Sequence, residues 1–297
     1  MTLATAPGSR LREVLDLERP LQVVGVINAY CGLLAENAGF RAIYLSGAGV
    51  SNASHGLPDL GLTTLSDVVE DTRRITAITA LPLLVDADTG WGSTLMIARA
   101  VRELTRAGAA GMHLEDQVDA KRCGHRPGAT LVSRREMVNR IKAAVDARVD
   151  PDFVIMARTD AHAVEGMDAT VERACYYVDA GADMIFAEAL TDLDGYRRFT
   201  QSVKVPVLAN ITEFGRTPIF TVDELRNAGI RLVLYPLSAF RAMSWIASRV
   251  YQTIRDHGTQ KDLLCEMQHR DELYRILDYH EQERQINQSL MRDHDDR

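Results

Sequence analysis

The stretch PLLVDADTGWGSTLMIARAVRELTRAGAAGMHLED, residues 82–116, contains one complete strand–helix–strand unit. Its two ends, Pro82–Asp88 and Gly111–Asp116, are short and almost continuously apolar, which is typical of parallel strands buried on both faces. The intervening segment Leu95–Ala107 has helical spacing, and Gly108 follows it in the position of a helix C-cap. Both predicted strands end in acidic residues. The stretch therefore predicts a βαβ unit that carries polar chemistry at the carboxyl ends of its strands.

The same pattern recurs on both sides of this unit. Further apolar runs of strand length occupy Val23–Asn28, Ala42–Gly47, Phe153–Asp160, Met184–Ala189, Pro206–Ile211 and Leu232–Leu237. Segments with helical spacing occupy Leu65–Ile78, Arg134–Ala147, Asp168–Ala180, Asp192–Val203 and Val222–Ala228. Eight strands alternating with helices predict an α/β fold of the (β/α)₈ TIM-barrel type. A doubly wound sheet is the alternative, and it is disfavoured because no GxGxxG follows the first strand.

The predicted barrel spans about residues 20–237, and a charged helical extension spans about 238–297. No repeat, low-complexity tract or Pro/Ser-rich linker separates the two parts. We therefore expect a single domain over residues 1–297.

Composition excludes several classes of protein. The chain has 297 residues, of which 46% are hydrophobic and 25% charged, and these are ordinary globular values. They exclude a disordered, collagen-like or disulfide-scaffold protein. The 34 basic and 41 acidic residues give a net charge of −7, which argues against a nucleic-acid partner.

The sequence also indicates the cellular compartment in which the protein is expected. No apolar run reaches the ~18–20 residues of a membrane-spanning helix, and the first residues lack the pattern of a signal peptide. The four cysteines, Cys31, Cys123, Cys175 and Cys265, are widely spaced and form no CxxC pair. We expect reduced thiols in a cytoplasmic protein with no membrane partner.

Polar residues gather where the predicted strands end, which is the functional end of such a barrel. They are Asn28, Tyr44, Ser46, Asp86, Asp88, His113, Glu115, Arg158, Asp160, Glu188, Asn210, Thr212 and Tyr235. Asp86 and Asp88 are two residues apart on one strand, so their side chains face the same side. With Glu115 they form an all-oxygen cluster that favours Mg²⁺ or Mn²⁺. The alternative is that these acids cap helices or pair with arginines.

The loop KRCGHRPG, Lys121–Gly128, is the second notable feature. Cys123 lies among four cationic or titratable neighbours, Lys121, Arg122, His125 and Arg126. Such surroundings predict a lowered thiol pKa and a candidate acid, base or nucleophile. Gly124 and Gly128 would let the loop move as a lid. The alternative is a basic surface loop with an incidental thiol.

Arginines and small residues complete the predicted pocket. Arg158, Arg241 and Arg270 are candidates for bidentate recognition of carboxylates, although each alone is compatible with a surface or ion-paired arginine. SGAG (Ser46–Gly49) and ANIT (Ala209–Thr212) offer backbone N–H groups, an amide and a hydroxyl to anionic oxygens. Together these residues predict a pocket for a small polycarboxylate bound to a divalent cation.

The sequence resembles the isocitrate lyase and phosphoenolpyruvate mutase superfamily almost end to end. KRCGH is similar to the superfamily's lyase signature, K-[KR]-C-G-H. The other motifs that carry the resemblance are YLSGAGV, GLPDLG, LLVDADTGWG, LEDQ, FVIMARTDA, LANITEFG, YPLSAFRAM and GTQK. Within the superfamily, these motifs are most similar to the 2-methylisocitrate lyases of the propionate-degrading methylcitrate cycle. Ala48 departs from the glycine of some members, and it removes no named ligand.

The resemblance implies a fold, a reaction and a set of roles. Members are (β/α)₈ barrels, usually homotetramers, that exchange a late helix between subunits. They cleave a C–C bond beside a hydroxyl with Mg²⁺ bound, here 2-methylisocitrate to pyruvate and succinate by retro-aldol chemistry. Cys123 is implied as general acid, Tyr44 as base or hydroxyl partner, and His125 as a third catalytic residue. The implied metal residues are Asp86, Asp88 and Glu115. The implied substrate shell is Ser46, Gly47, Ala48, Cys123, Gly124, Arg158, Glu188, Asn210, Ile211, Thr212, Arg241 and Arg270.

Other functions stay open at this stage. An isocitrate lyase, an oxaloacetate decarboxylase or a phosphonate C–P enzyme of the same superfamily is the near alternative, and the last two typically lack the KRCGH loop. Phe186 and Leu234 favour a substrate that carries a methyl group. A non-catalytic metabolite binder on this fold is a second class. A cysteine hydrolase using Cys123 and His125 is a third, disfavoured because residues two apart in a loop rarely form a nucleophile–base pair.

Overall fold

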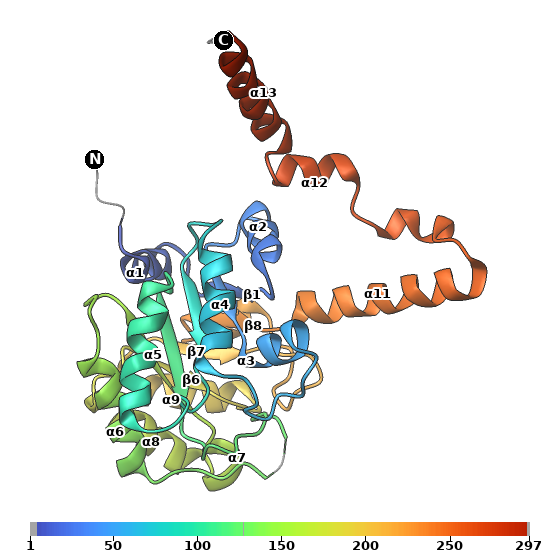
Figure 1. Ribbon diagram of the computed structural model, residues 1–297. Coiled ribbons are helices and arrows are strands. Elements are labelled where there is room, and N and C mark those ends of the chain that lie inside the picture. The colour runs from blue at the N-terminus through green and yellow to red at the C-terminus, as the bar shows by residue number, and fades with distance from the viewer. Residues whose placement is uncertain (1–4, 127, 296–297) are drawn as a thin grey trace. The chain divides into compact units, whose positions relative to one another are not determined.

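The chain folds around a closed barrel of parallel strands, as Figure 1 shows. The computed structural model describes residues 5–126 and 128–295. Within them, the barrel strands are β1 (Leu21–Gly25), β2 (Ala42–Leu45), β3 (Leu83–Asp86), β4 (Gly111–Glu115), β5 (Val154–Thr159), β6 (Met184–Ala187), β7 (Val207–Asn210) and β8 (Leu232–Tyr235). Each strand pairs with its neighbours in chain order, and β1 pairs with β8 through the register Leu21–Leu232. The predicted (β/α)₈ barrel is confirmed, and the doubly wound sheet is excluded because the sheet has no open edge.

Helices follow the strands and surround the barrel (Figure 1). Those between strands are α2 (Ala29–Asn37), α4 (Leu65–Thr76), α5 (Thr94–Arg106), α6 (Arg134–Asp146), α8 (Met167–Asp179), α9 (Leu193–Ser202) and α10 (Val222–Asn227). Shorter turns are α3 (Gly47–Gly49), η1 (Val50–Ser54) and α7 (His162–Glu165). The remaining elements are α1 (Pro7–Leu17), α11 (Ser238–His257), η2 (Lys261–Glu266), α12 (Arg270–Ile276) and α13 (Tyr279–Asp295). The C-cap predicted at Gly108 is confirmed by its positive φ angle, and Gly39, Gly181 and Gly229 have positive φ angles in the same position after their helices.

Side-chain caps define where several helices begin. The Thr64 hydroxyl accepts a hydrogen bond from the backbone N–H of Asp67, and the Asp67 carboxylate accepts one from the backbone N–H of Thr64. This reciprocal capping box satisfies two donors at the start of α4.

Replacing Thr64 by Ala should lower the free energy of unfolding by about 1 kcal/mol, because the first turn of α4 loses its side-chain acceptor. Thr64→Ser keeps the hydroxyl and should retain most of that stability. Urea unfolding of the two variants measures the difference. Equal stability of Thr64→Ala and the parent chain would contradict the assigned role of the cap.

Two apolar layers hold the barrel together. One fills the barrel interior with side chains such as Tyr44, Met156 and Phe186, and the other lies between the strands and the helices. Leu11 and Leu15 of α1 are buried with the interior layer, so α1 closes the amino end of the barrel. The opposite, carboxyl end is the end at which functional groups collect in barrels of this kind.

The chain divides into two compact units between Phe240 and Arg241. The first unit contains the barrel, and the second contains most of α11 together with η2, α12 and α13. The division lies close to the boundary expected from the sequence, and the assignment of a single domain stays a prediction.

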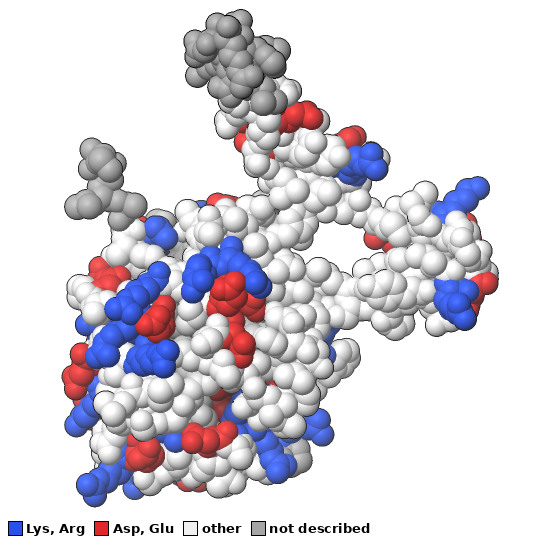
Figure 2. Space-filling model, viewed as in Figure 1, with Lys and Arg blue, Asp and Glu red and all other residues white. Residues whose placement is uncertain are grey.

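On the face of the barrel unit that Figure 2 presents, basic and acidic side chains are interspersed. On α4, for example, Glu70 pairs with both Arg73 and Arg74. Among the described residues, the structure has no helix that is both long and apolar enough to cross a membrane.

Candidate active site

The carboxyl ends of β3 and β4 bring three buried carboxylates together. Asp86 ends β3, Asp88 follows it, and Glu115 ends β4. Asp86 Oδ2 accepts a hydrogen bond from the backbone N–H of Gly47 at 2.9 Å, and Asp86 Oδ1 accepts one from that of Asp88 at 3.0 Å. The SGAG stretch thus directs an N–H group at a metal-candidate carboxylate. Asp88 has φ 45, a left-handed conformation that is uncommon outside glycine and concentrates at functional sites.

The charges around these carboxylates split their pKa values. Burial opposes ionisation of Asp86, but the charges of His113, Lys121 and Arg158 outweigh it and lower the Asp86 pKa. Burial and the negative charge of Asp86 raise the pKa of Asp88 to about 7. Two like charges in one buried site resist ionising together. The pair therefore calls for a cation between or beside its members.

Lys121 supplies a cation at this point. Its side chain is buried, its Nζ lies 2.8 Å from Asp88 Oδ1, and it forms an ion pair with Asp59. From the sequence alone, Lys121 is notable only as a neighbour of Cys123, and Asp59 is not predicted as a site residue. GLPDLG, the motif that contains Asp59, is the one signal that points to it.

The donor set at β3 and β4 fits a hard divalent cation. Mg²⁺ keeps several of its waters and needs only one or two protein carboxylates. Glu115 Oε1 is buried and has no hydrogen-bond partner, so the site contains an oxygen donor that is free to take a ligand or a metal-bound water. Among the described residues, no three His, Cys, Asp or Glu side chains form a complete metal cage. The residues therefore fit a largely hydrated Mg²⁺ better than a protein-enclosed metal.

Arg158 connects the acids of β4, β5 and β6. Its guanidinium contacts Asp160 in a bidentate pair at 2.9 and 3.0 Å, Glu115 at 3.4 Å and Glu188 at 3.3 Å. It also lies 5.0 Å from the centroid of the Phe186 ring. Arg158 and Glu188 were expected to bind substrate, and in this structure each contacts the other. Burial raises the pKa of Glu188, but Arg158 and the hydrogen bond from His125 outweigh it and lower that pKa to about 2.

The KRCGH loop packs onto this acid cluster. A Cβ added at Gly124 would lie 2.8 Å from Arg158 Nη2 and would overlap Asp160, so only glycine allows the backbone this close. His125 Nε2 lies 2.7 Å from Glu188 Oε1. The structure therefore brings Gly124, predicted in the substrate shell, and His125, predicted as catalytic, to Arg158 and Glu188, and their roles stay predictions. Pro127, within the loop, lies outside the described residues.

The predicted lowering of the Cys123 pKa is wrong. Cys123 has exposed surface, but the protein packed around its thiol partly desolvates it and raises its pKa, and the negative charge of Glu188 adds to this, against a backbone hydrogen bond from His125 and the charge of Arg158. The basic neighbours do not act as expected because Lys121 is paired with Asp59 and Asp88. Arg122 and Arg126 are exposed. A raised pKa keeps the thiol protonated, which suits an acid rather than a nucleophile.

Tyr44 and His113 form a buried pair beside Asp86. The Tyr44 hydroxyl lies 2.9 Å from His113 Nε2 and 3.2 Å from Asp86 Oδ2. Burial and the charge of Asp86 raise the Tyr44 pKa, and burial lowers the His113 pKa to about 4. Tyr44 is therefore a neutral hydroxyl that donates a hydrogen bond, rather than a ready base. His113 was noted only as a strand-end residue, and its contact with Tyr44 could not be seen in the sequence.

The remaining predicted residues fall into four groups. Asn210, Ile211 and Thr212 are buried at the end of β7, with Asn210 Nδ2 3.4 Å from both Glu188 carboxylate oxygens. Ser46 is buried beside Gly47, and Ala48 is half-buried.

Asn28 caps α2 by accepting a hydrogen bond from the backbone N–H of Cys31, which is a structural role. Arg241 and Arg270 belong to the second unit, so their expected place in the substrate shell stays a prediction.

A buried hydrogen-bond network behind β5 fixes the backbone that carries Arg158 and Asp160. Asp116, fully buried, accepts hydrogen bonds from Thr159 Oγ1 at 2.8 Å, the Asp160 N–H at 2.9 Å and the Tyr177 hydroxyl at 2.8 Å. Every one of these donors points at a carboxylate oxygen. The strand end that positions Arg158 therefore depends on the charge and both oxygens of Asp116.

Replacing Asp116 by Asn should lower the free energy of unfolding by roughly 1–3 kcal/mol, because an amide NH₂ would face a buried donor. Asp119→Asn is the matched control, since the Asp119 side chain is 69% exposed. Thermal unfolding of both variants measures the effect. An Asp116→Asn chain as stable as the control would show that the network does not need the second carboxylate oxygen.

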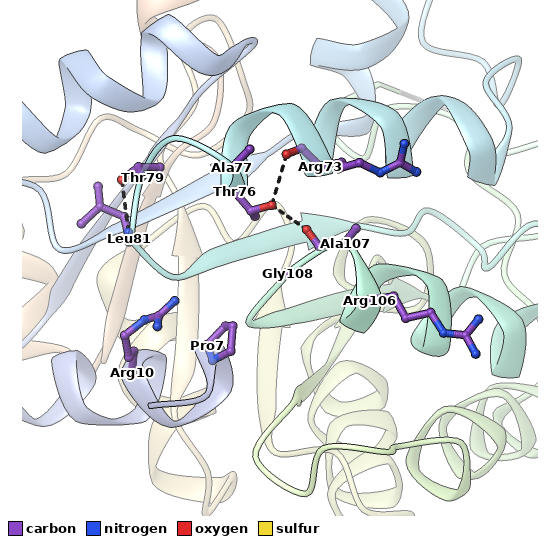
Figure 3. Close-up of a pocket in the computed structure, with 10 residues that line it drawn as sticks. All are labelled: Pro7, Arg10, Arg73, Thr76, Ala77, Thr79, Leu81, Arg106, Ala107 and Gly108. Carbon is purple, nitrogen blue, oxygen red and sulfur yellow. Dashed lines mark hydrogen bonds between the residues drawn. The ribbon is translucent and has the colours of Figure 1, made fainter. Parts of the chain in front are cut away.

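Figure 3 shows a cavity of about 350 Å³ that lies away from this site. Its lining comes from α1, the last residues of α4 and α5, and the segment before β3, so it belongs to the amino ends of the strands. In the figure, Arg73 and Arg106 point away from Thr79 and Leu81. Each pairs with a glutamate of its own helix. No predicted site residue lines this cavity, and we assign it no ligand.

Comparison with known proteins shows which proteins this chain is similar to. The family model described as phosphoenolpyruvate phosphomutase matches residues 11–255. The chain is 58% identical over 288 residues to 2-methylisocitrate lyase of Escherichia coli (strain K12), which is 97% of each chain. It is 49% identical to 2-methylisocitrate lyase of Aeropyrum pernix, over 94% of this chain and 89% of the relative.

Two solved structures of other enzymes are also similar to the chain. The crystal structure of 2,3-dimethylmalate lyase, described as a PEP mutase/isocitrate lyase superfamily member, matches with a TM-score of 0.89 and 33% identity over 97% of this chain and 96% of that one. Phosphonopyruvate hydrolase in complex with oxalate and Mg²⁺ matches with a TM-score of 0.82 and 28% identity over 94% of this chain and 97% of that one. The chain therefore belongs to the phosphoenolpyruvate phosphomutase family, and it is a carbon–carbon lyase.

Proposed function

We propose that the chain cleaves 2-methylisocitrate to pyruvate and succinate, in the methylcitrate cycle of propionate catabolism. The observation that carries the proposal is the KRCGH loop packed on the Arg158 acid cluster, beside the carboxylates of β3 and β4. High identity to proteins named 2-methylisocitrate lyase supports the choice of substrate. Phe186 lies beneath Arg158 and Leu234 lies in the barrel interior, so apolar side chains underlie the site.

The proposed reaction breaks a C–C bond in retro-aldol fashion. A base takes the substrate hydroxyl proton, the C–C bond breaks to leave the keto acid, and the bond electrons pass to the succinate fragment, which takes a proton from Cys123. Asp86 and Asp88, with Glu115 nearby, would hold Mg²⁺, or Mn²⁺ as the alternative, which supplies Lewis-acid stabilisation of the developing oxyanion.

Residues of the chain supply the other parts of the proposed chemistry. Cys123 would donate the proton to the succinate carbon, as general acid. The Tyr44 hydroxyl, placed between Asp86 and His113, would hydrogen-bond the substrate oxygen. Asn210–Thr212 would bind substrate carboxylates. The loop over Arg158 would exclude water from the carbanion-like fragment.

The deciding experiment compares turnover of 2-methylisocitrate and isocitrate with Mg²⁺ and then with EDTA, measuring pyruvate and glyoxylate separately. Preference for 2-methylisocitrate that is lost in EDTA is the expected result. A preference for isocitrate would overturn the substrate assignment and leave the proposed metal site and the role of Cys123 unchanged. One methyl group is worth only ~1–3 kcal/mol in such a pocket, so slow cleavage of isocitrate is compatible with the proposal. Cleavage of neither compound would favour a decarboxylase or a non-catalytic binder.

We also propose a homotetramer in the cytoplasm. Apolar side chains of α11 are exposed in the single chain, including Trp245 at 68% and Tyr251 at 73%, which supports burial against another copy. The four thiols are free, which supports a reducing compartment. Light scattering should give a mass four times that of one chain, and a monomer would contradict the assembly.

A further inference from the structure

Two loops of the barrel meet at His125. The backbone N–H of Arg216, in the segment between β7 and α10, donates a hydrogen bond to His125 Nδ1 at 3.0 Å. On the other side of the ring, His125 Nε2 lies 2.7 Å from Glu188 Oε1, and the Asn210 amide nitrogen, which also contacts Glu188, lies 3.4 Å from the same ring nitrogen. The imidazole is therefore held at both nitrogens, by a backbone amide on one side and by a buried carboxylate on the other.

These two contacts define the tautomer of His125. A nitrogen that accepts a hydrogen bond from an amide carries no proton, so Nδ1 is the acceptor nitrogen of the neutral ring. The proton then resides on Nε2, where it is donated to the Glu188 carboxylate. Only this neutral tautomer satisfies the Arg216 N–H and the Glu188 oxygen together.

Gly215 allows the second loop to come this close. A Cβ at residue 215 would lie 2.9 Å from His125 Nδ1, 3.0 Å from His125 Cε1 and 2.9 Å from the Thr212 methyl carbon. Real Cβ contacts are longer, so a larger residue would push the His125 ring or the Thr212 methyl away. The backbone at 215 is not left-handed, which means that close approach, and not φ, is the reason for glycine.

We propose that Gly215 and the backbone N–H of Arg216 position His125. This contact between the two loops, here called the clasp, thereby holds Cys123 over Arg158 and its acidic partners. Cys123 is two residues before His125, and Gly124 between them already packs against Arg158. Fixing the ring of His125 therefore fixes the backbone on both sides of Gly124. The role of Cys123 in this inference rests on the proposed function, whereas the clasp itself is a contact between two loops.

A double-mutant cycle tests the clasp without relying on turnover. The readout is the rate of tryptic cleavage after Arg122, which is exposed and depends on local opening of the loop. Gly215→Ala should raise this rate by up to about ten-fold, the effect of losing one hydrogen bond. In a His125→Ala background the same substitution should leave the rate unchanged, because the contact is already absent.

Matched controls separate the clasp from general effects. Arg216→Ala keeps the backbone N–H and should cleave after Arg122 like the parent chain. Gly32→Ala adds a methyl at ordinary contact distances, 3.5 Å from Thr79 Cγ2, and should also leave the rate unchanged. An equal rise for Gly215→Ala in both backgrounds would overturn the proposal, because the substitution would then act through Thr212.

Nitrogen NMR of the unmodified chain gives a second test that needs no variant. His125 should show a protonated Nε2 and an unprotonated Nδ1, and the opposite tautomer would overturn the clasp. If the chain cleaves neither 2-methylisocitrate nor isocitrate, the proposed function fails. The rates of tryptic cleavage after Arg122 and the tautomer of His125 still decide the clasp. With turnover present, Gly215→Ala should lower kcat more than it changes KM.

Discussion

Replacing Cys123 by Ser should lower kcat on 2-methylisocitrate by roughly 10²- to 10⁴-fold, the usual contribution of a positioned general acid. The hydroxyl of serine holds its proton far more tightly than a thiol, so it cannot deliver it to the carbanion-like fragment. The substitution keeps the size of the side chain and leaves Gly124 and His125 in contact with Arg158 and Glu188. Substrate binding should therefore persist, and KM should change little.

Steady-state kinetics with Cys265→Ser as the control measures this effect, since Cys265 is an exposed thiol in the second unit. Turnover like that of the parent chain in Cys123→Ser would remove the general-acid assignment. The pH profile adds a second signature. A general acid works only while protonated, so activity falls as pH rises through the thiol pKa. Since burial raises that pKa, the alkaline limb should lie above the ordinary thiol value of ~8.5 and disappear in the serine variant.

Replacing Arg158 by Leu should lower the free energy of unfolding by about 3–5 kcal/mol, because three buried carboxylates would lose their shared cation. Glu115, Asp160 and Glu188 all contact the guanidinium and are almost fully buried. Arg158→Lys keeps the charge but loses the two-pronged contact with Asp160, so it should lose less stability. Arg102→Leu, at an exposed position, is the control.

The loss for Arg158→Leu should shrink as pH falls from 8 to 5. In the parent chain, Arg158 helps to lower the folded-state pKa of Glu188 to about 2, so that contribution stays constant between pH 8 and 5 and is lost only as pH falls from the unfolded-state pKa toward 2. In the variant, unpaired buried carboxyl groups have raised pKa values and become neutral at mild acidity. Urea unfolding at several pH values measures this trend. A loss that stays constant with pH would show that packing, and not charge, dominates at this position.

The fold could be predicted from the sequence because the barrel depends on local patterns. Each strand is a short apolar run, and each main helix between strands has its own apolar spacing, so these elements could be predicted one by one. The ends of the helices were harder to predict. The helix expected over Leu65–Ile78, for example, ends at Thr76. Ala77 and Ile78 still form hydrogen bonds to the helix, and such fraying is invisible to apolar spacing.

The candidate site was predicted as a set of strand-end residues, and their contacts were not. Strand-end position alone predicted that Asp86, Asp88 and Glu115 lie at the carboxyl end of the barrel, and their role as metal ligands stays a prediction. The partner of Lys121 is Asp59, which is 62 residues away and comes from a loop rather than a strand. Desolvation of the thiol raises its pKa, and that pairing removes the positive charge that was expected to oppose this effect. Charge counted along a loop does not report the field at a thiol when distant carboxylates neutralise it.

The pairing of β1 with β8 has a consequence for how the chain acquires its structure. The residues of this last hydrogen-bonded seam, such as Leu21 and Leu232, are made at opposite ends of the barrel sequence. A growing polypeptide cannot complete the cylinder until β8 has left the ribosome, and until then β1 has an unpaired edge. Such non-local pairing slows folding and exposes strands to aggregation. Nascent chains that stop before Tyr235 should therefore need chaperone protection, however well their first seven strands are encoded.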